Sequence, residues 1–234
     1  MKKQPIAIIG GMGPEASVYL YNTMIKQSIA IFHAVNNDDF PEILLYSIPV
    51  PDFISTNEKR HEALEILKEK VENMNLLNPL CYAIACNTAH VLIDELQRVA
   101  ISPFTSIVDE VVKEVSKSEI KKIGLLGTPS TLKSNIYQDT LSDLGIKSVV
   151  PTSTEIEILE KIIRKVIAGT TEKSDINKLI KIANRLIEDG AEGIILGCTE
   201  LPLVFPDEYS FPVYNSIEII SKTLLEKYYS QSGS

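Results

Sequence analysis

The sequence is poor in the residues on which several classes of protein depend. It has no tryptophan, three cysteines and three histidines, and it contains no Cys-x-x-Cys pair. Such an odd and sparse set of cysteines does not form a disulfide scaffold. The three histidines, His33, His61 and His90, show no metal-ligand spacing with the cysteines. We therefore expect neither a disulfide framework nor a bound metal ion.

Long apolar runs and clusters of basic residues are missing as well. No stretch reaches the roughly 18 apolar residues that a membrane-spanning helix needs, and the apolar run after Lys3 stops at Gly10, too early for a signal peptide. The formal net charge is -8, without any run rich in Lys or Arg, which makes nucleic acid and anionic membranes poor partners. The remaining composition is ordinary for a globular protein, and we expect a cytoplasmic one.

What the sequence does contain is an alternation of short apolar runs and segments of helical period. The runs predict strands at Ile6–Gly10, Ile43–Ile48, Leu80–Cys86, Ile123–Gly127, Ser148–Val150 and Gly193–Gly197. The periodic segments predict helices at Glu58–Leu77, Ala89–Val99, Thr131–Leu144, Glu155–Ala168 and Asp175–Asp189. Near-continuous apolar strands separated by helices are typical of parallel sheets covered on both faces, so we predict an α/β fold.

The chain also repeats itself once. KKIGLLGTPST from Lys121 resembles PIAIIGGMGPE from Pro5, and GAEGIILGCTELP, which ends at Pro202, resembles NPLCYAIACNTAH, which ends at His90. SPFTSIVDEVV and FPVYNSIEII form a third pair. Three matched blocks in the same order indicate two α/β halves of similar design, which meet near residues 116–120.

Each half contains a cysteine at the end of its third apolar run, Cys86 within ACNT and Cys198 within GCTE. A cysteine in that place lies at the carboxyl end of a parallel strand, where α/β sheets bind ligands. Backbone N–H groups at the start of the following helix lower the pKa of such a thiol. Two thiols facing one cleft can remove a proton from one face of a carbon acid and return one to the other, which inverts the carbon. Cys81, at the start of its strand, is interpreted as a core residue.

The motifs GGMGPEA, ACNTAH and GCTELP together resemble those of the aspartate/glutamate racemase family, most closely its aspartate racemase branch, over essentially the whole chain. The resemblance implies an amino-acid racemase that uses no pyridoxal phosphate, metal or nucleotide and commonly forms a homodimer. It also implies two similar parallel-sheet α/β domains, related by a pseudo-two-fold axis, with the active site in the cleft between them. We assign residues 1–106 and 214–234 to the first domain and 107–213 to the second.

The resemblance further implies roles for individual residues, beginning with Cys86 and Cys198 as the acid/base pair. The substrate-binding residues are then Met12, Asn87, Thr88, Thr128, Thr131, Thr199 and Glu200. Glu200 stands where glutamate racemases have a histidine, which favours the aspartate branch. It could orient Cys198 or bind the substrate ammonium group, or it could be a first-turn acid favoured by the helix dipole. His90, one helical turn after Cys86, is a candidate for tuning the thiol or for a capping role.

Two departures from the aspartate-specific pattern concern the substrate. Phe53 occupies the position of an arginine that contacts a substrate carboxylate, and Glu157 occupies that of a lysine. Loss of a charge-assisted hydrogen bond costs about 1.5–3 kcal/mol, enough to change the preferred substrate. A neutral or basic amino acid is therefore an alternative to aspartate, unless Lys59, Arg60 or Lys161 compensates.

Two other classes of function can be weighed against this one. A non-catalytic amino-acid-binding module would keep the cleft and carry vestigial thiols. A Rossmann oxidoreductase is suggested by Gly11, Gly13 and Ala16, which fit the dinucleotide fingerprint, but it needs an acidic residue at the end of the second strand, and none occurs there before Asp52. We interpret Gly10, Gly11 and Gly13 instead as positions where the backbone closely approaches a small substrate.

Overall fold

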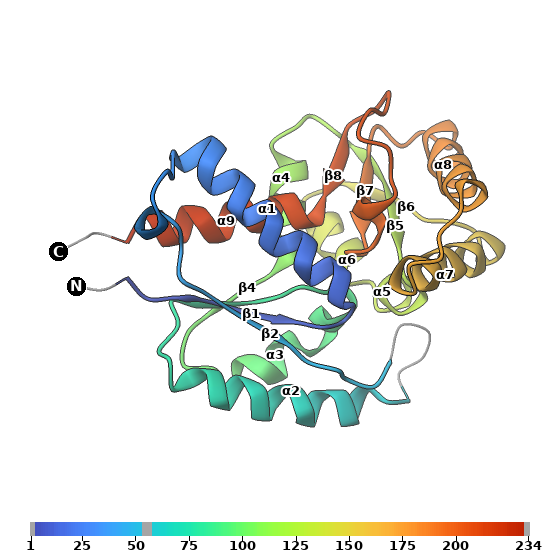
Figure 1. Ribbon diagram of the computed structural model, residues 1–234. Helices are drawn as coiled ribbons and strands as arrows, with labels where there is room; N and C mark the ends of the chain where they lie inside the picture. The colour runs from blue at the N-terminus through green and yellow to red at the C-terminus, as the bar shows by residue number, and fades with distance from the viewer. Residues whose placement is uncertain (1–2, 53–57, 232–234) are drawn as a thin grey trace.

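The repeat in the sequence corresponds to a repeat in the sheets. The computed structural model describes residues 3–52 and 58–231. These residues form two four-stranded sheets with the orders β2-β1-β3-β4 and β6-β5-β7-β8 (Figure 1), and every neighbouring pair of strands is parallel. The second sheet thus repeats the order of the first, which confirms the predicted α/β fold with two parallel-sheet domains.

The six predicted strands are present to within two residues at either end, and two short edge strands were not predicted. The first sheet contains β1 (Ile6–Gly10), β2 (Ile43–Ser47), β3 (Cys81–Ile84) and β4 (Phe104–Thr105). The second contains β5 (Lys122–Gly127), β6 (Lys147–Val149), β7 (Ile194–Gly197) and β8 (Val213–Asn215). With two and three residues, β4 and β8 are too short to show a period in the sequence.

Helices cover the sheets and connect their strands. They are α1 (Pro14–Phe32), α2 (Arg60–Asn75), α3 (Ile93–Gln97), α4 (Ile107–Ser116), α5 (Pro129–Lys133), α6 (Ile136–Asp143), α7 (Ser153–Ile167), α8 (Lys173–Glu188) and α9 (Ser216–Tyr229), with 3₁₀ turns η1 (Asn37–Asp39), η2 (Thr88–Leu92) and η3 (Leu201–Leu203). Within the two described ranges, none of the helices has both the length and the hydropathy that crossing a membrane requires.

Two of the predicted helices are divided in the structure, so those predictions were wrong in detail. The segment predicted as one helix over Thr131–Leu144 is α5 followed by α6, because Asn135 between them has a left-handed backbone with a φ of 57°. Asparagine tolerates that conformation better than most residues. The segment predicted over Ala89–Val99 is η2 followed by α3.

One hydrophobic core joins the two halves. It combines Ile6 and Ile8 of the first sheet with Ile123 and Leu125 of the second. The helices α1, α4, α6 and α9 supply most of the remainder of this core, and α9 packs against α1 and α4. Figure 1 shows the C-terminal α9 lying alongside α1, so the end of the chain returns to the first half. Two smaller cores each belong to a single sheet and its own helices.

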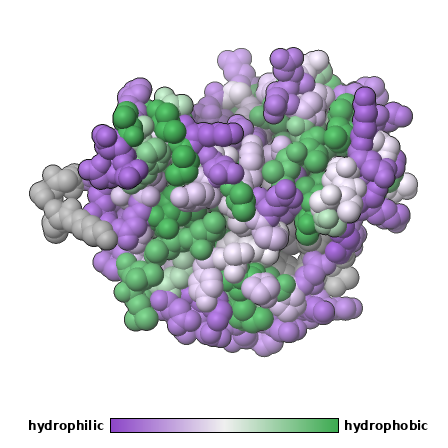
Figure 2. Space-filling model, viewed as in Figure 1, coloured by the Kyte–Doolittle hydropathy of each residue, from purple (hydrophilic) through white to green (hydrophobic). Residues whose placement is uncertain are grey.

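The visible surface of α1 is partly apolar. Figure 2 shows hydrophobic side chains on the face of the molecule where α1 lies, and Val18, Tyr21 and Ile29 of this helix are exposed. Leu45 and Tyr46 on the edge strand β2 are exposed as well. Exposed apolar patches often mark protein interfaces, but the homodimer implied by the resemblance stays a prediction.

The glycines of the loop between β1 and α1 are required by the chain itself. Gly11 has a φ of +93°, and a Cβ atom there would lie 2.5 Å from the backbone N and O of Ile48. A Cβ atom on Gly10 would lie 2.5 Å from Ser17 Oγ, and that hydroxyl accepts a hydrogen bond from the Gly11 N–H at 2.9 Å. These two glycines therefore accommodate β2 and α1, and the close approach of a substrate to Gly10, Gly11 and Gly13 stays a prediction.

A stability measurement tests this explanation of Gly11. Gly11→Ala forces a side chain into an unfavourable φ and against fixed backbone, so we expect its free energy of unfolding in urea to fall by about 3 kcal/mol or more. Gly145→Ala is the matched control, because Gly145 has a φ of +72° and no atom lies within 4 Å of its Cβ position. It should lose only about 1 kcal/mol. Equal losses in the two variants would contradict the steric explanation.

Candidate active site

The two predicted catalytic thiols follow buried strands at equivalent places in the two halves. Cys86 comes two residues after the end of β3 and just before η2. Cys198 follows directly after β7 and precedes η3. The residues are 7% and 5% exposed. Parallel strands in equivalent positions therefore deliver both thiols to the carboxyl ends of the two sheets, where α/β proteins bind ligands.

A cavity of about 260 Å³ lies beside Cys86 and has walls from both halves. It is lined by Gly11, Met12, Gly13, Pro14, Val50, Pro51, Asp52, Cys86 and Thr88 from the first half and by Arg164 and Ile167 of α7 from the second. Met12, Cys86 and Thr88 are thus predicted site residues that line it. Its size and mixed lining suit a small polar ligand.

The surroundings of Cys86 both favour and oppose its ionisation. The backbone N–H groups of Thr88 and Ala89 and the Thr88 hydroxyl interact with the sulfur and stabilise its thiolate form. Burial acts in the opposite direction and, together with the negative charge of Glu200, raises the pKa of the Cys86 thiol to about 12. The thiol is therefore protonated at neutral pH in this structure.

Cys198 is bound to a carboxylate. Its Sγ donates a hydrogen bond to Glu200 Oε2 at 2.9 Å, and the Thr199 hydroxyl donates to the same oxygen at 3.0 Å. Burial raises the pKa of the Cys198 thiol well above its usual value, and the charge and hydrogen bond of Glu200 add to this effect. The other oxygen, Glu200 Oε1, accepts a hydrogen bond from the N–H of Gly13 at 2.9 Å. Glu200 thus connects the second thiol with the first loop of the other half.

Three threonine hydroxyls from the two halves lie in contact beside Cys86. Thr88 Oγ1 is 2.9 Å from Thr128 Oγ1 and 3.0 Å from Thr131 Oγ1, and Thr128 Oγ1 is 2.9 Å from Thr131 Oγ1. All three residues are buried. The structure therefore brings together three predicted substrate-binding residues, whose hydroxyl hydrogens can rotate toward a carboxylate.

Asn87 forms a hydrogen bond between the two halves and is not among the residues that line the cavity. Its Oδ1 accepts a hydrogen bond from the Tyr137 hydroxyl at 2.5 Å, and its Nδ2 donates to Ser216 Oγ at 3.2 Å. The Ser216 hydroxyl in turn donates to the Leu196 carbonyl. Tyr137 and Ser216 were not predicted, although Ser216 lies in the third repeated block, where it directly follows β8.

His90 is held between two backbone groups. Its Nδ1 lies 2.8 Å from the Cys86 carbonyl oxygen, and its Nε2 accepts a hydrogen bond from the Ile107 N–H at 3.0 Å. The ring is therefore the neutral tautomer that donates from Nδ1. Burial lowers the pKa of His90 to about 4. These contacts fix the backbone at Cys86, so His90 influences the thiol through the position of that backbone.

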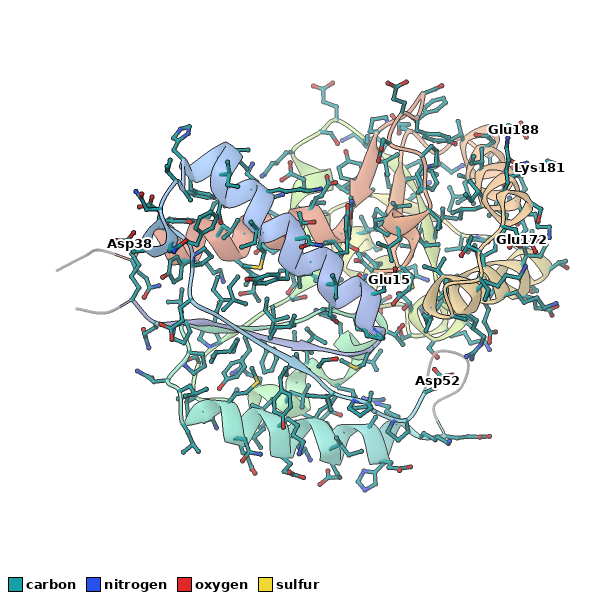
Figure 3. All side chains as sticks on the ribbon, in the orientation of Figure 1. Glu15, Asp38, Asp52, Glu172, Lys181 and Glu188 are labelled. Atoms are coloured by element: carbon teal, nitrogen blue, oxygen red, sulfur yellow. The ribbon has the colours of Figure 1, made fainter. Side chains whose placement is uncertain are left out.

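The cation that sequence inspection missed is Arg164. Its Nη1 donates to Asp52 Oδ2 at 2.9 Å, across the cavity from one half to the other, and its Nε donates to Glu160 Oε1 at 2.9 Å. Figure 3 shows Asp52 just below α7, the helix that carries Arg164. Arg164 lies seven residues after Glu157, two turns along α7, so helical periodicity from Glu157 could have pointed to it.

Arg60 and Glu157, two charged residues considered from the sequence, do not line the cavity. Phe53 is outside the described residues. Glu157 is exposed on α7. Arg60 Nη2 donates to the Val91 carbonyl at 2.6 Å and to Glu95 at 3.2 Å, so it connects α2 to η2 and α3. Residues 3–52 and 58–231 contain no group of three or more His, Cys, Asp or Glu side chains placed to hold a metal ion.

A duplicated α/β fold with a buried thiol at the same strand end of each half defines a class of two-domain enzymes with the site between the domains. Residues 9–223 match the model of the Asp/Glu/Hydantoin racemase family. The chain belongs to this family, and it is an isomerase that acts as an amino-acid racemase.

Individual relatives agree with this assignment over almost the full length. The crystal structure of an aspartate racemase homologue from Pyrococcus horikoshii is similar at a TM-score of 0.78 and 33% identity, covering 95% of this chain and 98% of that one. The aspartate racemase of Picrophilus torridus gives a TM-score of 0.81 at 27% identity, covering 95% and 93%. The broad specificity amino-acid racemase RacX of Bacillus subtilis is 26% identical over 227 residues, which are 95% of this chain and 97% of that protein.

The environment of His90 leads to a prediction about stability and pH. Its pKa is about 4 in the folded chain and about 6.5 when unfolded, so the unfolded chain alone takes up this proton between those values. Stability should therefore fall as the pH is lowered from about 6.5 to about 4. His90→Gln should remove about 3 kcal/mol of that fall, measured by urea unfolding at several pH values.

His61→Gln is the control for this measurement, because His61 is exposed on α2. It should keep the pH dependence of the unsubstituted protein. Identical pH dependence in His90→Gln and in the unsubstituted protein would show that His90 is not a buried neutral ring.

Proposed function

We propose that this enzyme racemises its amino acid by moving the Cα proton between the thiols of Cys86 and Cys198, without a cofactor. The observation that carries the proposal is the pair of buried thiols at equivalent strand ends of the two halves. The negative charge of Glu200 raises the pKa of both thiols, and the charge of Cys86 also raises the pKa of Cys198. These shared electrostatic contacts support the proposal that the two sulfurs act in one site.

The chemistry requires one thiolate and one thiol on opposite faces of the substrate. The thiolate takes the proton from Cα, and the electron pair of the C–H bond passes into the substrate carboxylate. The second thiol then gives its proton to the opposite face of the carbon. The product is the mirror image, and the two sulfurs have exchanged their protonation states. The substrate ammonium group brings a positive charge beside the thiols, which lowers the pKa of both.

The polar groups around Cys86 suit the α-carboxylate of an amino acid. The hydroxyls of Thr88, Thr128 and Thr131 form one cluster from both halves. As charge develops on the carboxylate during proton removal, hydroxyl donors already in place stabilise it without reorganisation. We assign these three residues to substrate binding, as the resemblance implies, and we place no such role on Asn87, whose amide is used by Tyr137 and Ser216.

Aspartate is the first substrate to test. Arg164 is the cation among the described residues that line the cavity, and a guanidinium group can bind a side-chain carboxylate with two parallel hydrogen bonds. Two of the structural relatives are called an aspartate racemase homologue and an aspartate racemase. In this assignment Arg164 replaces the anchors that Phe53 and Glu157 do not provide.

A racemase of basic or neutral amino acids is the second candidate, and one contact favours it. Arg164 is paired with Asp52, so the cavity offers a carboxylate as well as a guanidinium group. A basic side chain can bind Asp52, whereas an acidic one must displace Asp52 from Arg164. The relative from Bacillus subtilis is named for broad specificity.

The two-thiol mechanism predicts the fate of solvent deuterium. Incubation of a single enantiomer in deuterated water should give the opposite enantiomer with deuterium at Cα, while the remaining substrate is still unlabelled at early times. Cys86→Ala and Cys198→Ala should each lose at least about 100-fold in kcat, because each removes one acid/base group. Chiral chromatography with mass spectrometry measures both results.

Cys81→Ala is the matched control, since Cys81 is buried in the core between the halves. It should racemise the substrate at the rate of the unsubstituted enzyme. Full activity in both Cys86→Ala and Cys198→Ala would refute the mechanism.

The Asp52–Arg164 pair predicts how substrate preference changes. Arg164→Met should lower kcat/KM for aspartate by about 10- to 100-fold, the worth of a charge-assisted hydrogen bond, and should affect lysine far less. Asp52→Asn should do the reverse, weakening a basic substrate. A panel of single enantiomers measures kcat/KM for each variant. Arg98→Met, at an exposed arginine, is the control, and equal losses for acidic and basic substrates in Arg164→Met would contradict the assignment.

A further inference from the structure

Glu200 holds a buried position with three donors around one carboxylate. The residue is 4% exposed. The Cys198 thiol and the Thr199 hydroxyl donate to Oε2, and the Gly13 N–H donates to Oε1. Buried carboxylates need such partners, because an unpaired charge away from water is costly. In this case one of the partners is a catalytic thiol.

The two thiols of the site therefore have different surroundings. Cys86 faces donors, namely the N–H groups of Thr88 and Ala89 and the Thr88 hydroxyl. Donors stabilise a thiolate. Cys198 has one such donor, the backbone N–H of Glu200, and it also faces an acceptor, Glu200 Oε2. A carboxylate at hydrogen-bonding distance stabilises the thiol form and repels the thiolate.

We propose that Glu200 makes the acid/base pair unequal, by holding Cys198 in its protonated form as the proton donor and leaving Cys86 to ionise first as the base. The proposal rests on the two-thiol function and adds a positioning residue to it. Glu200 acts through Cys198 and exchanges no proton with the substrate.

The contact with Gly13 explains why the carboxylate stays in place. Glu200 Oε1 lies 2.9 Å from Gly13 N, and a Cβ atom on Gly13 would be 3.3 Å from the same oxygen. The hydrogen bond comes from the other half of the molecule, whereas the thiol and Thr199 are on the same loop as Glu200. The carboxylate is therefore fixed from both sides of the site, and its Oε2 remains directed at the Cys198 sulfur.

The inequality has a consequence for the reaction. When the Cys86 thiolate has taken the Cα proton and the Cys198 thiol has given its proton to the opposite face, the Cys198 sulfur keeps the electron pair of its S–H bond. This thiolate then lies beside the Glu200 carboxylate, so the enzyme form left after one direction is less stable than the form that began it. The reverse direction starts from that less stable form.

Rates of the two directions do not reveal this difference. The two enantiomers have equal free energies in water, so their kcat/KM values must be equal at every pH. The ionisation of each thiol has to be measured directly instead. Alkylation by iodoacetamide does so, because the thiolate is the reacting form.

The test is the alkylation rate of each cysteine at pH 8, followed by peptide mass spectrometry in the unsubstituted enzyme and in Glu200→Gln. Removing the negative charge should raise the rate at Cys198 by about threefold or more for each unit by which its pKa falls, allowing for the lower nucleophilicity of a less basic thiolate. The rate at Cys86 should rise less, and the rate at Cys81 should not change. An unchanged or lower rate at Cys198 overturns the proposal.

Two further variants make the result specific. Glu192→Gln is the matched control: Glu192 also accepts backbone hydrogen bonds, from the N–H groups of Lys121 and Lys122, but it touches neither thiol, so all three rates should stay the same. Glu200→Asp keeps the charge and should stay close to the unsubstituted rate at Cys198. If circular dichroism shows that Glu200→Gln does not fold, Glu200→Asp still tests the proposal. The proposal is overturned if the alkylation rate at Cys198 in Glu200→Asp rises as much as is expected for Glu200→Gln.

The racemase reaction supplies an independent readout. In Glu200→Gln the pH profile of kcat/KM should move to lower pH, whereas a purely structural loss would reduce its height without moving it. Failure of the unsubstituted enzyme to racemise any amino acid would reject the proposed function, and the alkylation rates would still decide the role of Glu200.

Discussion

The site depends on the joint hydrophobic core that holds the two halves together. Each half supplies one of the two thiols that the proposed acid/base pair requires, so neither half alone contains the pair. Ile6 and Ile8 of the first sheet and Ile123 and Leu125 of the second share one core, and α9 completes it by packing on α1 and α4. The relative position of Cys86 and Cys198 is therefore set by apolar packing, the least directional and largest stabilising contribution in the molecule.

Polar contacts across the halves add the precision that apolar packing lacks. The hydroxyl cluster of Thr88 with Thr128 and Thr131, the hydrogen bond from Tyr137 to Asn87 and that from Gly13 to Glu200 all cross between the halves. The atoms concerned are buried, so each contact that is lost leaves a polar group without a partner. A small shift of one half against the other is therefore resisted at three points around the thiols.

The internal repeat explains how much could be predicted from the sequence. The similar design of the two halves and the equivalent placement of Cys86 and Cys198 follow from blocks that occur twice in the same order, and the parallel sheets follow from apolar strands separated by helices. The order of the strands within each sheet was not predicted. The break at Asn135 was not predictable from period, because the apolar pattern continues across it. Arg164 was missed because its place in the site depends on how α7 faces Asp52 in the segment after β2 of the other half, and the sequence carries no direct sign of contacts between halves. The role of Glu200 could be framed as alternatives, but the hydrogen bond from the Gly13 N–H comes from tertiary structure.

The raised pKa of the thiols is the remaining physical problem for a racemase. With a pKa of about 12, forming the Cys86 thiolate at pH 7 costs on the order of 7 kcal/mol. The N–H groups of Thr88 and Ala89 are already directed at the sulfur, so they offset part of the cost of burying a thiolate. The guanidinium group of Arg164, which lines the cavity, is already engaged by Asp52 and Glu160. In the proposed reaction the substrate ammonium group supplies a positive charge beside the sulfur, so that the thiol ionises when the substrate binds.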